Sequence, residues 1–344
     1  MGYDMSNSKP LFSVIITCYN YQSYVCCAIE SVLRQTHTDY EIIVVNDGST
    51  DDSWSAISRY SDQVTAINTE NRGSIPACLT GFAASHGDYI LFLDADDLLN
   101  ETALSTVAEQ LTPQTSKIQY KLQPIDADGH RLGDPFPNLS PDYDRQQMIE
   151  SINKLGAYAT PPTSGNIYRR DVYLTIGPID YDFGIDGVAY LVAPFKGDVI
   201  HIDETLGQYR IHSNNLSGFG SGSYSKMERE ITVFRKRLEH LDRLITEDPK
   251  AIGSVHLKPD YLYTVEREAF IEVLKGRRLR FKSMCRYLAH IGTSLTGTER
   301  LSYSLFGFLL FAAPAAAGRR LLDFRINPRQ DSPLRRFAKR FVRD

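Results

Sequence analysis

Three carboxylates follow an apolar segment, and they are the clearest sign of chemistry in the sequence. The segment, DYILFLD, covers residues 88–94, and its last residue, Asp94, is followed by Asp96 and Asp97. Carboxylates this close together repel one another, and burying them costs free energy. A hard divalent cation, Mn²⁺ or Mg²⁺, would relieve that repulsion, and phosphate oxygens would complete its coordination.

This D-x-D pattern is also compatible with roles besides metal binding. An aspartate often starts a helix, so Asp96 or Asp97 could be a helix cap. An EF-hand is excluded, because the glycine at loop position six and the glutamate at position twelve are missing. A phosphatase with an aspartate nucleophile stays possible, although Leu98 stands where threonine or valine is usual. The absence of G-x-x-x-x-G-K-[ST] and G-x-G-x-x-G excludes P-loop and dinucleotide sites.

The elements that would position these aspartates alternate along the first hundred residues. Segments typical of buried strands cover 12–19, 40–47, 63–68 and 88–94. Helical spacing covers 23–35, 50–60, 74–85 and 100–111, with Asn100 expected as the last cap. The alternation predicts an α/β fold, with parallel strands covered by helices on both faces.

Polar side chains stand at the carboxyl ends of all four expected strands, where ligands bind in open α/β sheets. In chain order, the candidates are Thr17, Tyr19, Asn20, Asp47, Arg72 and Asp94. An aromatic ring can stack on a nucleobase, an aspartate can accept from a base N–H, and an arginine can donate to a phosphate. Tyr19 could instead be a core residue, and Asp47 a turn residue before Gly48.

The pattern changes after residue 116. Residues 117–133 predict two antiparallel strands joined at Asp128-Gly129. Helices are expected over 145–155 and 182–196, and residues 224–290 are mainly helical in pattern.

The C-terminal part is apolar and basic. Residues 301–318 carry no charge, residues 334–343 have the pattern of an amphipathic basic helix, and residues 275–344 contain 16 Lys and Arg against 4 Asp and Glu. Such a segment fits an anionic membrane surface. The alternative is a helix packed on the domain with a solvated basic face. We expect no nucleic-acid partner.

Composition indicates a globular intracellular protein. The chain of 344 residues has five cysteines, an odd number without a C-x-x-C pair, which favours free thiols in a reducing compartment. Residues 1–10 lack the apolar region of a secretory signal.

Two stretches resemble the family-2 glycosyltransferases of GT-A fold. SVIITCYNYQSYVCCAIESVLRQTHTDYEIIVVNDGSTDDS and ENRGSIPACLTGFAASHGDYILFLDADD match the family in order, spacing and local sequence over about residues 11–110. Residues 163–180 and 185–217 resemble the second half of the same domain. The resemblance implies a Rossmann-like, nucleotide-binding mixed sheet flanked by helices, here with a helical, membrane-associating C-terminal region.

The resemblance also implies roles for the donor-side residues. Thr17, Tyr19 and Asp47 would hold the nucleobase, with Asn20 beside them and Arg72 close by. Asp94 would meet the ribose or the metal. Asp96 would bind the metal, Mn²⁺ or Mg²⁺, and His212 in YRIHSNN would reach the diphosphate or the metal.

On the acceptor side, the family places its catalytic base in an E-D pair before an amphipathic helix. Here the pair reads Ile185-Asp186, so the aspartate matches and the glutamate does not. An inverting transfer needs one base for the acceptor hydroxyl, and Asp186 would supply it; the alternative is a helix N-cap. Residues Ser164, Gly165 and Asn166 would line the sugar or acceptor site, or form a turn after Pro161-Pro162.

The implied reaction moves a sugar from a nucleotide diphosphate sugar, UDP-linked, to a hydroxyl of a glycan or lipid-linked acceptor with inversion. Its setting would be bacterial surface polysaccharide assembly, at the cytoplasmic face of the cell membrane. A sugar nucleotidyltransferase would need a basic, glycine-rich loop that TCYNYQSY lacks. A non-catalytic scaffold of the same fold is disfavoured by the intact Asp94, Asp96 and Asp186.

These expectations divide the chain into five parts. Residues 1–10 would be a flexible N-terminus, 11–116 the nucleotide-sugar-binding part, and 117–222 the acceptor and catalytic-base part. Residues 223–300 would be a helical region, and 301–344 the apolar and basic region.

Overall fold

The computed structural model describes residues 11–139, 143–181, 184–212, 224–248 and 255–326. Contacts divide the chain into two compact units. Within the described ranges, the first unit takes in residues up to 153, 157–212 and 237–257, and the second takes in 154–156, 224–236 and 258–326. The expected segments 1–10 and 334–343 lie outside the described residues.

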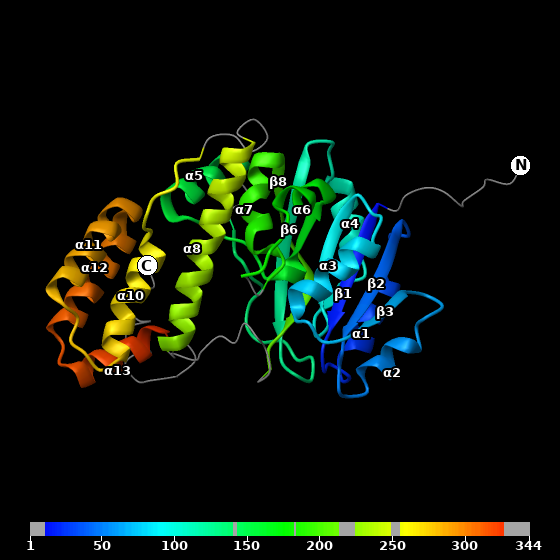
Figure 1. Ribbon diagram of the computed structural model, residues 1–344, viewed down its shortest axis with the longest axis horizontal. Helices are drawn as coiled ribbons and strands as arrows, with labels where there is room; N and C mark the ends of the chain where they lie inside the picture. The colour runs from blue at the N-terminus through cyan, green and yellow to red at the C-terminus, as the bar shows by residue number, and fades with distance from the viewer. Residues whose placement is uncertain (1–10, 140–142, 182–183, 213–223, 249–254, 327–344) are drawn as a thin grey trace, which may run out of the picture. The chain divides into compact units, whose positions relative to one another are not determined.

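The first unit is built on one mixed sheet of eight strands in the order β3-β2-β1-β4-β7-β6-β8-β5 (Figure 1). The strands are β1 (Phe12–Cys18), β2 (Tyr40–Asp47), β3 (Thr65–Thr69), β4 (Tyr89–Asp94), β5 (Leu98–Leu99), β6 (Thr115–Ile125), β7 (Asn166–Arg169) and β8 (Asp198–Arg210). The first four are parallel, as the alternating pattern predicted. β7 runs antiparallel to β4 and β6, whereas β8 runs parallel to β6 and antiparallel to β5.

Helices cover both faces of the sheet. On one face, α1 (Val25–Leu33), α2 (Ser53–Ser58) and α4 (Ala103–Gln110) share a core with alternate strand residues such as Val14 and Ile16. On the other face, α3 (Ser74–Ala84) lies so close that a Cβ on Gly81 would come within 2.4 Å of the Ile15 side chain. Glycine is therefore needed at this helix–sheet contact.

Three further helices lie wholly or mostly in the first unit, between β6 and β8 in the sequence. They are α5 (Arg145–Leu155), which ends in the second unit, α6 (Arg170–Ile176) and α7 (Asp186–Lys196). A 3-10 turn, Thr163–Gly165, leads into β7. The helix expected over 145–155 is thus present, whereas the one expected over 182–196 begins at Asp186, and residues 182 and 183 lie outside the described residues.

The second unit is helical. It contains the first part of α8 (Tyr224–Glu247), together with α10 (Leu262–Leu274), α11 (Phe281–Ser294), α12 (Gly297–Ala312) and α13 (Ala315–Ile326). Apolar side chains of all five helices form its core, including Met227, Phe270, Met284, Leu310 and Leu322.

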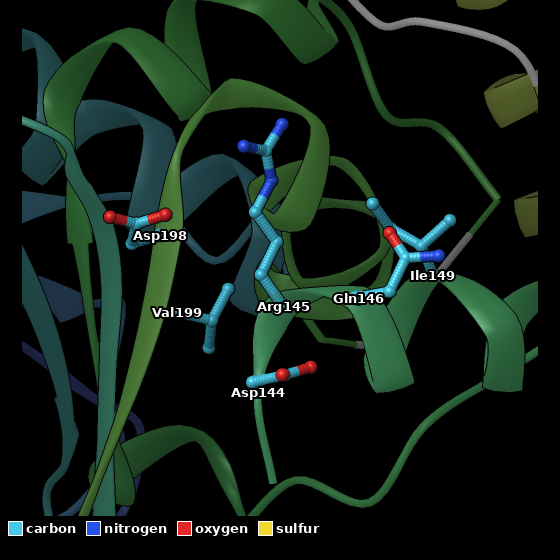
Figure 2. A pocket seen from close by; sticks show the side chains of 6 residues that line it. All are labelled: Asp144, Arg145, Gln146, Ile149, Asp198 and Val199. Carbon is cyan, nitrogen blue, oxygen red and sulfur yellow. The ribbon is translucent and has the colours of Figure 1, made fainter.

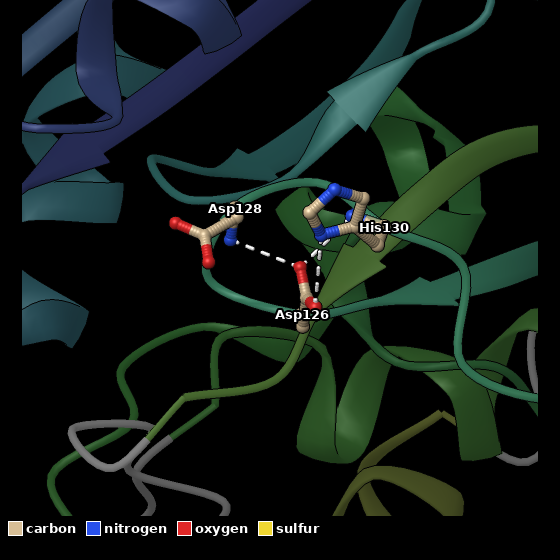
Figure 3. Close-up of side chains that lie close together, drawn as sticks. All are labelled: Asp126, Asp128 and His130. Atoms are coloured by element: carbon tan, nitrogen blue, oxygen red, sulfur yellow. Dashed lines mark hydrogen bonds and ion pairs between the residues drawn. The ribbon is translucent and has the colours of Figure 1, made fainter.

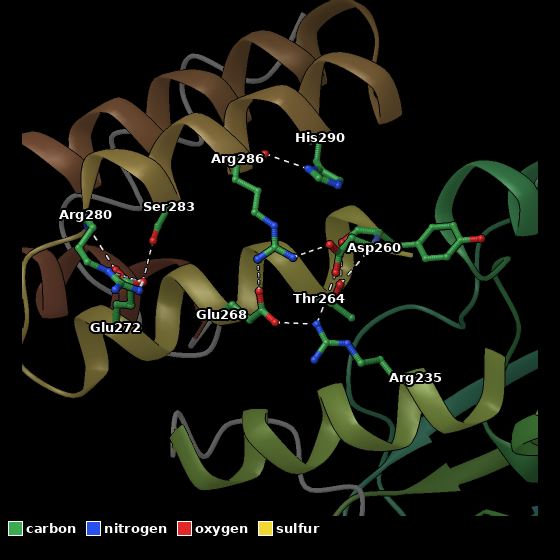
Figure 4. Close-up of polar contacts among 10 residues, drawn as sticks. Arg235, Asp260, Thr264, Glu268, Glu272, Arg280, Ser283, Arg286 and His290 are labelled. Carbon is green, nitrogen blue, oxygen red and sulfur yellow. Dashed lines mark hydrogen bonds and ion pairs between the residues drawn. The ribbon is translucent and has the colours of Figure 1, made fainter. Parts of the chain in front are cut away.

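An ion-pair network links three segments of this unit (Figure 4). Arg235 and Arg286 each contact both Asp260 and Glu268, at distances from 2.5 to 3.4 Å. Networks of several partly buried charges stabilise more than isolated surface pairs. The network therefore helps to hold α8, α10 and α11 together.

Two local expectations were wrong. Asn100 does not cap α4, which begins at Ala103 after Thr102; instead, the Asn100 side chain donates to the Thr205 carbonyl at 2.6 Å. Only the first of the two strands expected over 117–133 is regular: β6 ends at Ile125, and the returning chain makes isolated antiparallel bridges to it, Leu122 with Phe136 and Ile125 with Arg131. The register shifts by two residues between these bridges, which interrupts a regular ladder.

The uncharged stretch 301–318 is divided between two helices. α12 ends at Ala312 and α13 starts at Ala315, because Pro314 cannot donate a backbone hydrogen bond and favours the extended conformation seen at Ala313. Within the described ranges, no helix has the length and apolar character needed to cross a membrane.

Candidate active site

The three aspartates of the D-x-D segment lie together at the carboxyl end of β4. Asp94 is the last residue of the strand, and the Asp97 N–H donates to the Asp94 carbonyl at 3.0 Å, which closes a turn. One carboxylate oxygen from each of Asp94, Asp96 and Asp97 lies within 4.8 Å of the others. The turn therefore aims three negative groups at a common point.

Two of these carboxylates are held by distant segments. Ser164 donates to Oδ2 of Asp97 at 2.6 Å, and the Arg210 backbone N–H donates to Oδ1 of Asp97 at 2.8 Å. Oδ2 of Asp96 lies 2.9 Å from Nε2 of His212. Among the described residues, no side chain donates a hydrogen bond to the Asp94 carboxylate, which leaves its oxygens available to a ligand.

The cluster carries a strong electrostatic cost. Burial above all, with the negative charges of Asp96 and Asp186 adding to it, raises the pKa of Asp94 to about 7. Burial also raises the pKa of Asp97, with the other two aspartates adding to it, and that of Asp96, where His212 acts in the opposite direction. Oxygen donors that repel one another in this way fit a hard divalent cation.

Asp47, at the end of β2, organises the neighbouring strand end. Its two oxygens accept the backbone N–H groups of Arg72 and Gly73, each at 2.9 Å. Gly48 follows with φ +64, and a Cβ there would lie 2.4 Å from the Asn71 nitrogen. Asp47 thus fixes the loop that presents the exposed Arg72, and each of its oxygens keeps a second acceptor position.

The end of β1 supplies three predicted residues. Thr17 pairs in register with Asp94 of β4, so the two lie side by side at this edge. The Tyr19 ring is 44% exposed, as a stacking surface must be. Asn20, with φ 60, accepts the Thr50 N–H at 2.8 Å and therefore ties its loop to the one after β2.

Asp186 approaches the cluster from the other half of the sheet. It lies in the first turn of α7 rather than at its N-cap, which is Ile185. Thr163 Oγ1 donates to Oδ1 of Asp186 at 3.3 Å. Its charge acts on Asp94, so the two carboxylates belong to one electrostatic site.

The segment 164–166 lies deeper than a binding surface usually does. Ser164 is fully buried and contacts the D-x-D turn twice, through Asp97 and by accepting the Asp94 N–H at 3.1 Å. Asn166 is 1% exposed and donates to the Pro161 and Pro162 carbonyls at 3.0 and 2.9 Å. The segment therefore supports the D-x-D turn from the protein interior, with Gly165 between Ser164 and Asn166.

Two residues that were not predicted complete the site. Arg210 is 5% exposed; its Nε donates to the Asp96 carbonyl at 2.8 Å, and its guanidinium carbon lies 4.8 Å from the centre of the Tyr24 ring. The same ring stacks on His212, with centroids 5.3 Å apart. The sequence signal for Arg210 was its position two residues before His212, in YRIHSNN.

A second acidic group, Asp126, Asp128 and His130, lies in the turn after β6 (Figure 3). Oδ1 of Asp126 accepts the N–H groups of Asp128 and His130 at 3.0 and 2.8 Å. Local side-chain to backbone bonds of this kind stabilise turns. We assign the group to the fold of the turn.

A surface depression of about 570 Å³ lies at the start of β8, the opposite end of that strand from Arg210. Figure 2 shows its lining: Asp144, Arg145, Gln146, Ile149, Asp198 and Val199. It contains none of the predicted site residues, and the site described above is therefore separate from it.

Comparison with known proteins gives one consistent picture. Residues 13–161 match the family model for glycosyl transferase family 2. The uncharacterized glycosyltransferase alr2836 of Nostoc sp. is 35% identical over 227 residues, which cover 63% of this chain and 69% of that protein. Glycosyltransferase GlyA of Streptococcus pneumoniae is 27% identical over 60% of this chain, but the match covers only 31% of GlyA. In fold, S. aureus TarS 1-349 in complex with UDP-GlcNAc aligns with a TM-score of 0.53 at 14% identity, over 90% of both chains.

Proposed function

Because the chain belongs to glycosyl transferase family 2, we propose that it transfers a sugar from a nucleotide diphosphate sugar to an acceptor hydroxyl with inversion. One observation carries the proposal: the 3-10 turn Thr163–Gly165 contacts both groups, because Thr163 donates to Asp186 at 3.3 Å and Ser164 donates to Asp97 at 2.6 Å. A candidate base and a candidate cation site from distant parts of the sequence thus lie on either side of one turn.

The donor would bind along the carboxyl ends of β1 to β4. The exposed Tyr19 ring would stack on the nucleobase, and Thr17, Asn20 and Asp47 would surround it. Arg72, on a loop fixed by Asp47, would donate to the base or to a phosphate. We infer a UDP-sugar, a choice supported by the UDP and UDP-GlcNAc complexes of the structurally similar TarS.

Asp94, Asp96 and His212 would hold Mn²⁺ or Mg²⁺, with Asp97 supporting the turn. When bound, the cation stabilises negative charge on the leaving diphosphate. The chain's own part is to keep the three carboxylates converged, through Ser164, Arg210 and His212, so that no rearrangement is needed when the donor arrives.

Asp186 would accept the proton of the acceptor hydroxyl. The acceptor oxygen then forms its bond to the anomeric carbon, while the bond from that carbon to the diphosphate breaks and the diphosphate leaves with the electron pair. A single displacement inverts the anomeric configuration, and no covalent enzyme intermediate is required. The acceptor would lie at the start of α7, in front of the buried segment 164–166 that supports this side of the site.

We further propose a glycan or lipid-linked acceptor, and peripheral association with the inner face of a bacterial membrane during surface polysaccharide assembly. Exposed apolar side chains support this setting: Leu301, Leu305, Phe308 and Leu309, between 49% and 72% exposed, fall on one side of α12 by helical spacing, and we call them the apolar face. The same unit also exposes basic residues, namely Arg277, Arg278, Lys282, Arg300, Arg319 and Arg320. An apolar face in a unit that exposes cations fits an anionic lipid surface.

The decisive experiment measures thermal stability with UDP in the presence and absence of Mn²⁺. Ligands that bind only the folded protein raise its melting temperature. We expect UDP and Mn²⁺ together to stabilise the protein more than either alone, and UDP-sugars to be hydrolysed or transferred with release of UDP. Absence of any stabilisation by nucleotide with either cation would contradict the proposal.

A further inference from the structure

A fully buried lysine lies behind the candidate active site and has no role in the reaction as proposed above. Lys117, on β6, has 0% exposed surface. Burial lowers the pKa of its amine, and the negative charge of Asp186 acts in the opposite direction. Leaving an ammonium in a protein interior costs several kcal/mol, so its surroundings must offset that cost.

The surroundings of Lys117 match an ammonium group. Its Nζ donates to Oε1 of Gln119 at 2.9 Å, to the Tyr158 hydroxyl at 3.2 Å and to Oγ1 of Thr160 at 2.8 Å. Three acceptors suit the three N–H bonds of a charged lysine. The rings of Tyr158 and Tyr168 lie 5.0 and 5.4 Å from Nζ, at distances that favour a cation.

One chain of contacts leads from Lys117 to α7. The Tyr158 hydroxyl uses its own proton to donate to the Tyr190 carbonyl at 2.7 Å. Tyr190 lies one helical turn beyond Asp186, and both belong to α7. The lysine therefore fixes, through Tyr158, the part of the helix that carries the proposed base.

A second chain leads to the loop before β7. Thr160 Oγ1 donates to Oδ1 of Asn166 at 2.9 Å, and the Asn166 amide in turn binds the carbonyls of Pro161 and Pro162. The next residue is Thr163, which donates to Asp186 at 3.3 Å. The two chains thus start at one ammonium: one ends on α7, the helix that carries Asp186, and the other ends in the loop whose Thr163 contacts the Asp186 carboxylate.

We propose that Lys117 is a positioning residue for Asp186, holding the loop 160–166 and helix α7 in the one arrangement that directs the Asp186 carboxylate at the acceptor hydroxyl. This inference rests on the proposed role of Asp186 as base. A lysine that merely filled the core would affect folding but would not act selectively on the chemical step.

The test compares Lys117→Met with Lys121→Met. Both lysines are on β6, but Lys121 pairs with the half-exposed Asp203 at 2.5 Å and lies outside the network. We expect Lys117→Met to lower kcat about 10²-fold, the cost of a misplacement of about 1 Å, with the KM for the donor unchanged. Lys121→Met should stay within about twofold of the parent. Equal kcat values for the two variants would overturn the proposal.

A double substitution separates this inference from the proposed function. If Lys117 acts through Asp186, adding Lys117→Met to Asp186→Asn lowers the residual activity no further, because the two effects are coupled. Multiplicative losses would overturn the role of Lys117. Near-parental turnover by Asp186→Asn alone would instead refute the base, whatever Lys117 does.

Two milder variants cover the case in which Lys117→Met does not fold. Tyr158→Phe breaks the contact to α7, and Thr160→Val breaks the contact to the loop, while the lysine remains in both. Each should lower kcat several-fold at unchanged donor KM, with cooperative thermal unfolding retained. Parental kcat in both folded variants would overturn the proposal.

Discussion

The backbone N–H of Arg210 donates a hydrogen bond to Oδ1 of Asp97, 113 residues earlier in the chain. The Arg210 side chain adds a bond to the Asp96 carbonyl, and its Nη1 contacts the carbonyls of Asp126 and Ala127 at 3.1 and 3.0 Å. The end of β8 therefore holds the D-x-D turn and the turn after β6 with one residue. The convergence of the three aspartates depends on this link.

Replacing Arg210 by methionine should destabilise the protein by about 2–4 kcal/mol, because three carbonyls lose the buried, charged donor that they share. It should also weaken cation-dependent UDP binding. Urea unfolding and calorimetry would measure the two effects. Arg170→Met is the matched control, since its guanidinium also binds a carbonyl, that of Gly87, and a hydroxyl, that of Ser85. A similar loss of UDP binding in both variants would contradict a specific role for Arg210.

Asp186→Asn keeps the size of the side chain and removes the base. We expect turnover to fall about 10²- to 10⁴-fold, the usual contribution of a general base, while UDP binding persists. Steady-state UDP release and calorimetry would give the two quantities. Asp198→Asn, at the far end of β8, is the control and should change neither turnover nor UDP binding. Loss of UDP binding together with turnover would indicate a donor-side role instead.

Asp96→Ala should weaken the Mn²⁺-dependent part of UDP binding about tenfold or more, since one carboxylate ligand is lost. It also removes the carboxylate that lies 2.9 Å from Nε2 of His212. Asp126→Ala removes a carboxylate from the other acidic group and should leave metal dependence intact. Titrations of Mn²⁺ at fixed UDP would compare them, and identical metal dependence in Asp96→Ala and the parent would exclude Asp96 as a ligand.

The cation-free protein should lose stability as the pH rises. The pKa of Asp94 is raised by burial from 3.8 to about 7, so the folded state binds this proton more tightly than the unfolded state. Stability is therefore highest below about pH 4 as far as this group is concerned, and falls as the pH rises through about 7. Asp94→Asn should make the free energy of unfolding in urea, measured without cation, depend less on pH. Added Mn²⁺ should restore stability at high pH in the parent but not in this variant. A profile unchanged by the substitution would contradict the raised pKa.

The apolar face of the second unit should bind anionic vesicles. Leu305→Ser combined with Phe308→Ser removes two side chains that are 58% and 52% exposed, so folding should be little affected. We expect vesicle flotation to fall about tenfold or more, because each buried apolar side chain contributes about 1.5–3 kcal/mol. Leu174→Ser is the control, because Leu174 is 67% exposed but lies in the first unit, and it should leave vesicle flotation unchanged.

Self-association is the competing role for that face. A dimer in gel filtration that dissociates on Leu305→Ser and Phe308→Ser substitution, without any change in flotation, would contradict the membrane proposal. Truncation after Ile326 tests the basic tail separately. It spares α13, whose Leu322 is fully buried in the core of the second unit.

The parallel half of the sheet could be predicted because its signals are local. Apolar segments such as 40–47 coincide with their strand, and the carboxyl ends of parallel strands meet at one edge. Family resemblance supplied His212 and Asp186, which spacing alone does not reveal. The structure places His212 against Asp96, and Asp186 within the field of Asp94.

Other features depend on contacts that no local pattern encodes. Asn100 has the composition of a helix cap, but its amide finds the Thr205 carbonyl, 105 residues away. The second strand expected near Asp128 is reduced to two bridges, and the two-residue register shift between them is not visible in the sequence pattern. Lys117 and Arg210 look like ordinary surface residues in the sequence, since their burial follows from β6 and β8 becoming interior strands.

The pairing between β4 and β7 is short, with three residues of each strand in register, Tyr89–Leu91 against Ile167–Arg169. Because this seam is so narrow, the bonds from Ser164 and Arg210 to Asp97 also join the two parts of the sheet. A substitution beyond the seam that shifts either residue would therefore disturb the D-x-D turn. We expect the proposed donor side and the proposed acceptor side to change together in evolution rather than one at a time.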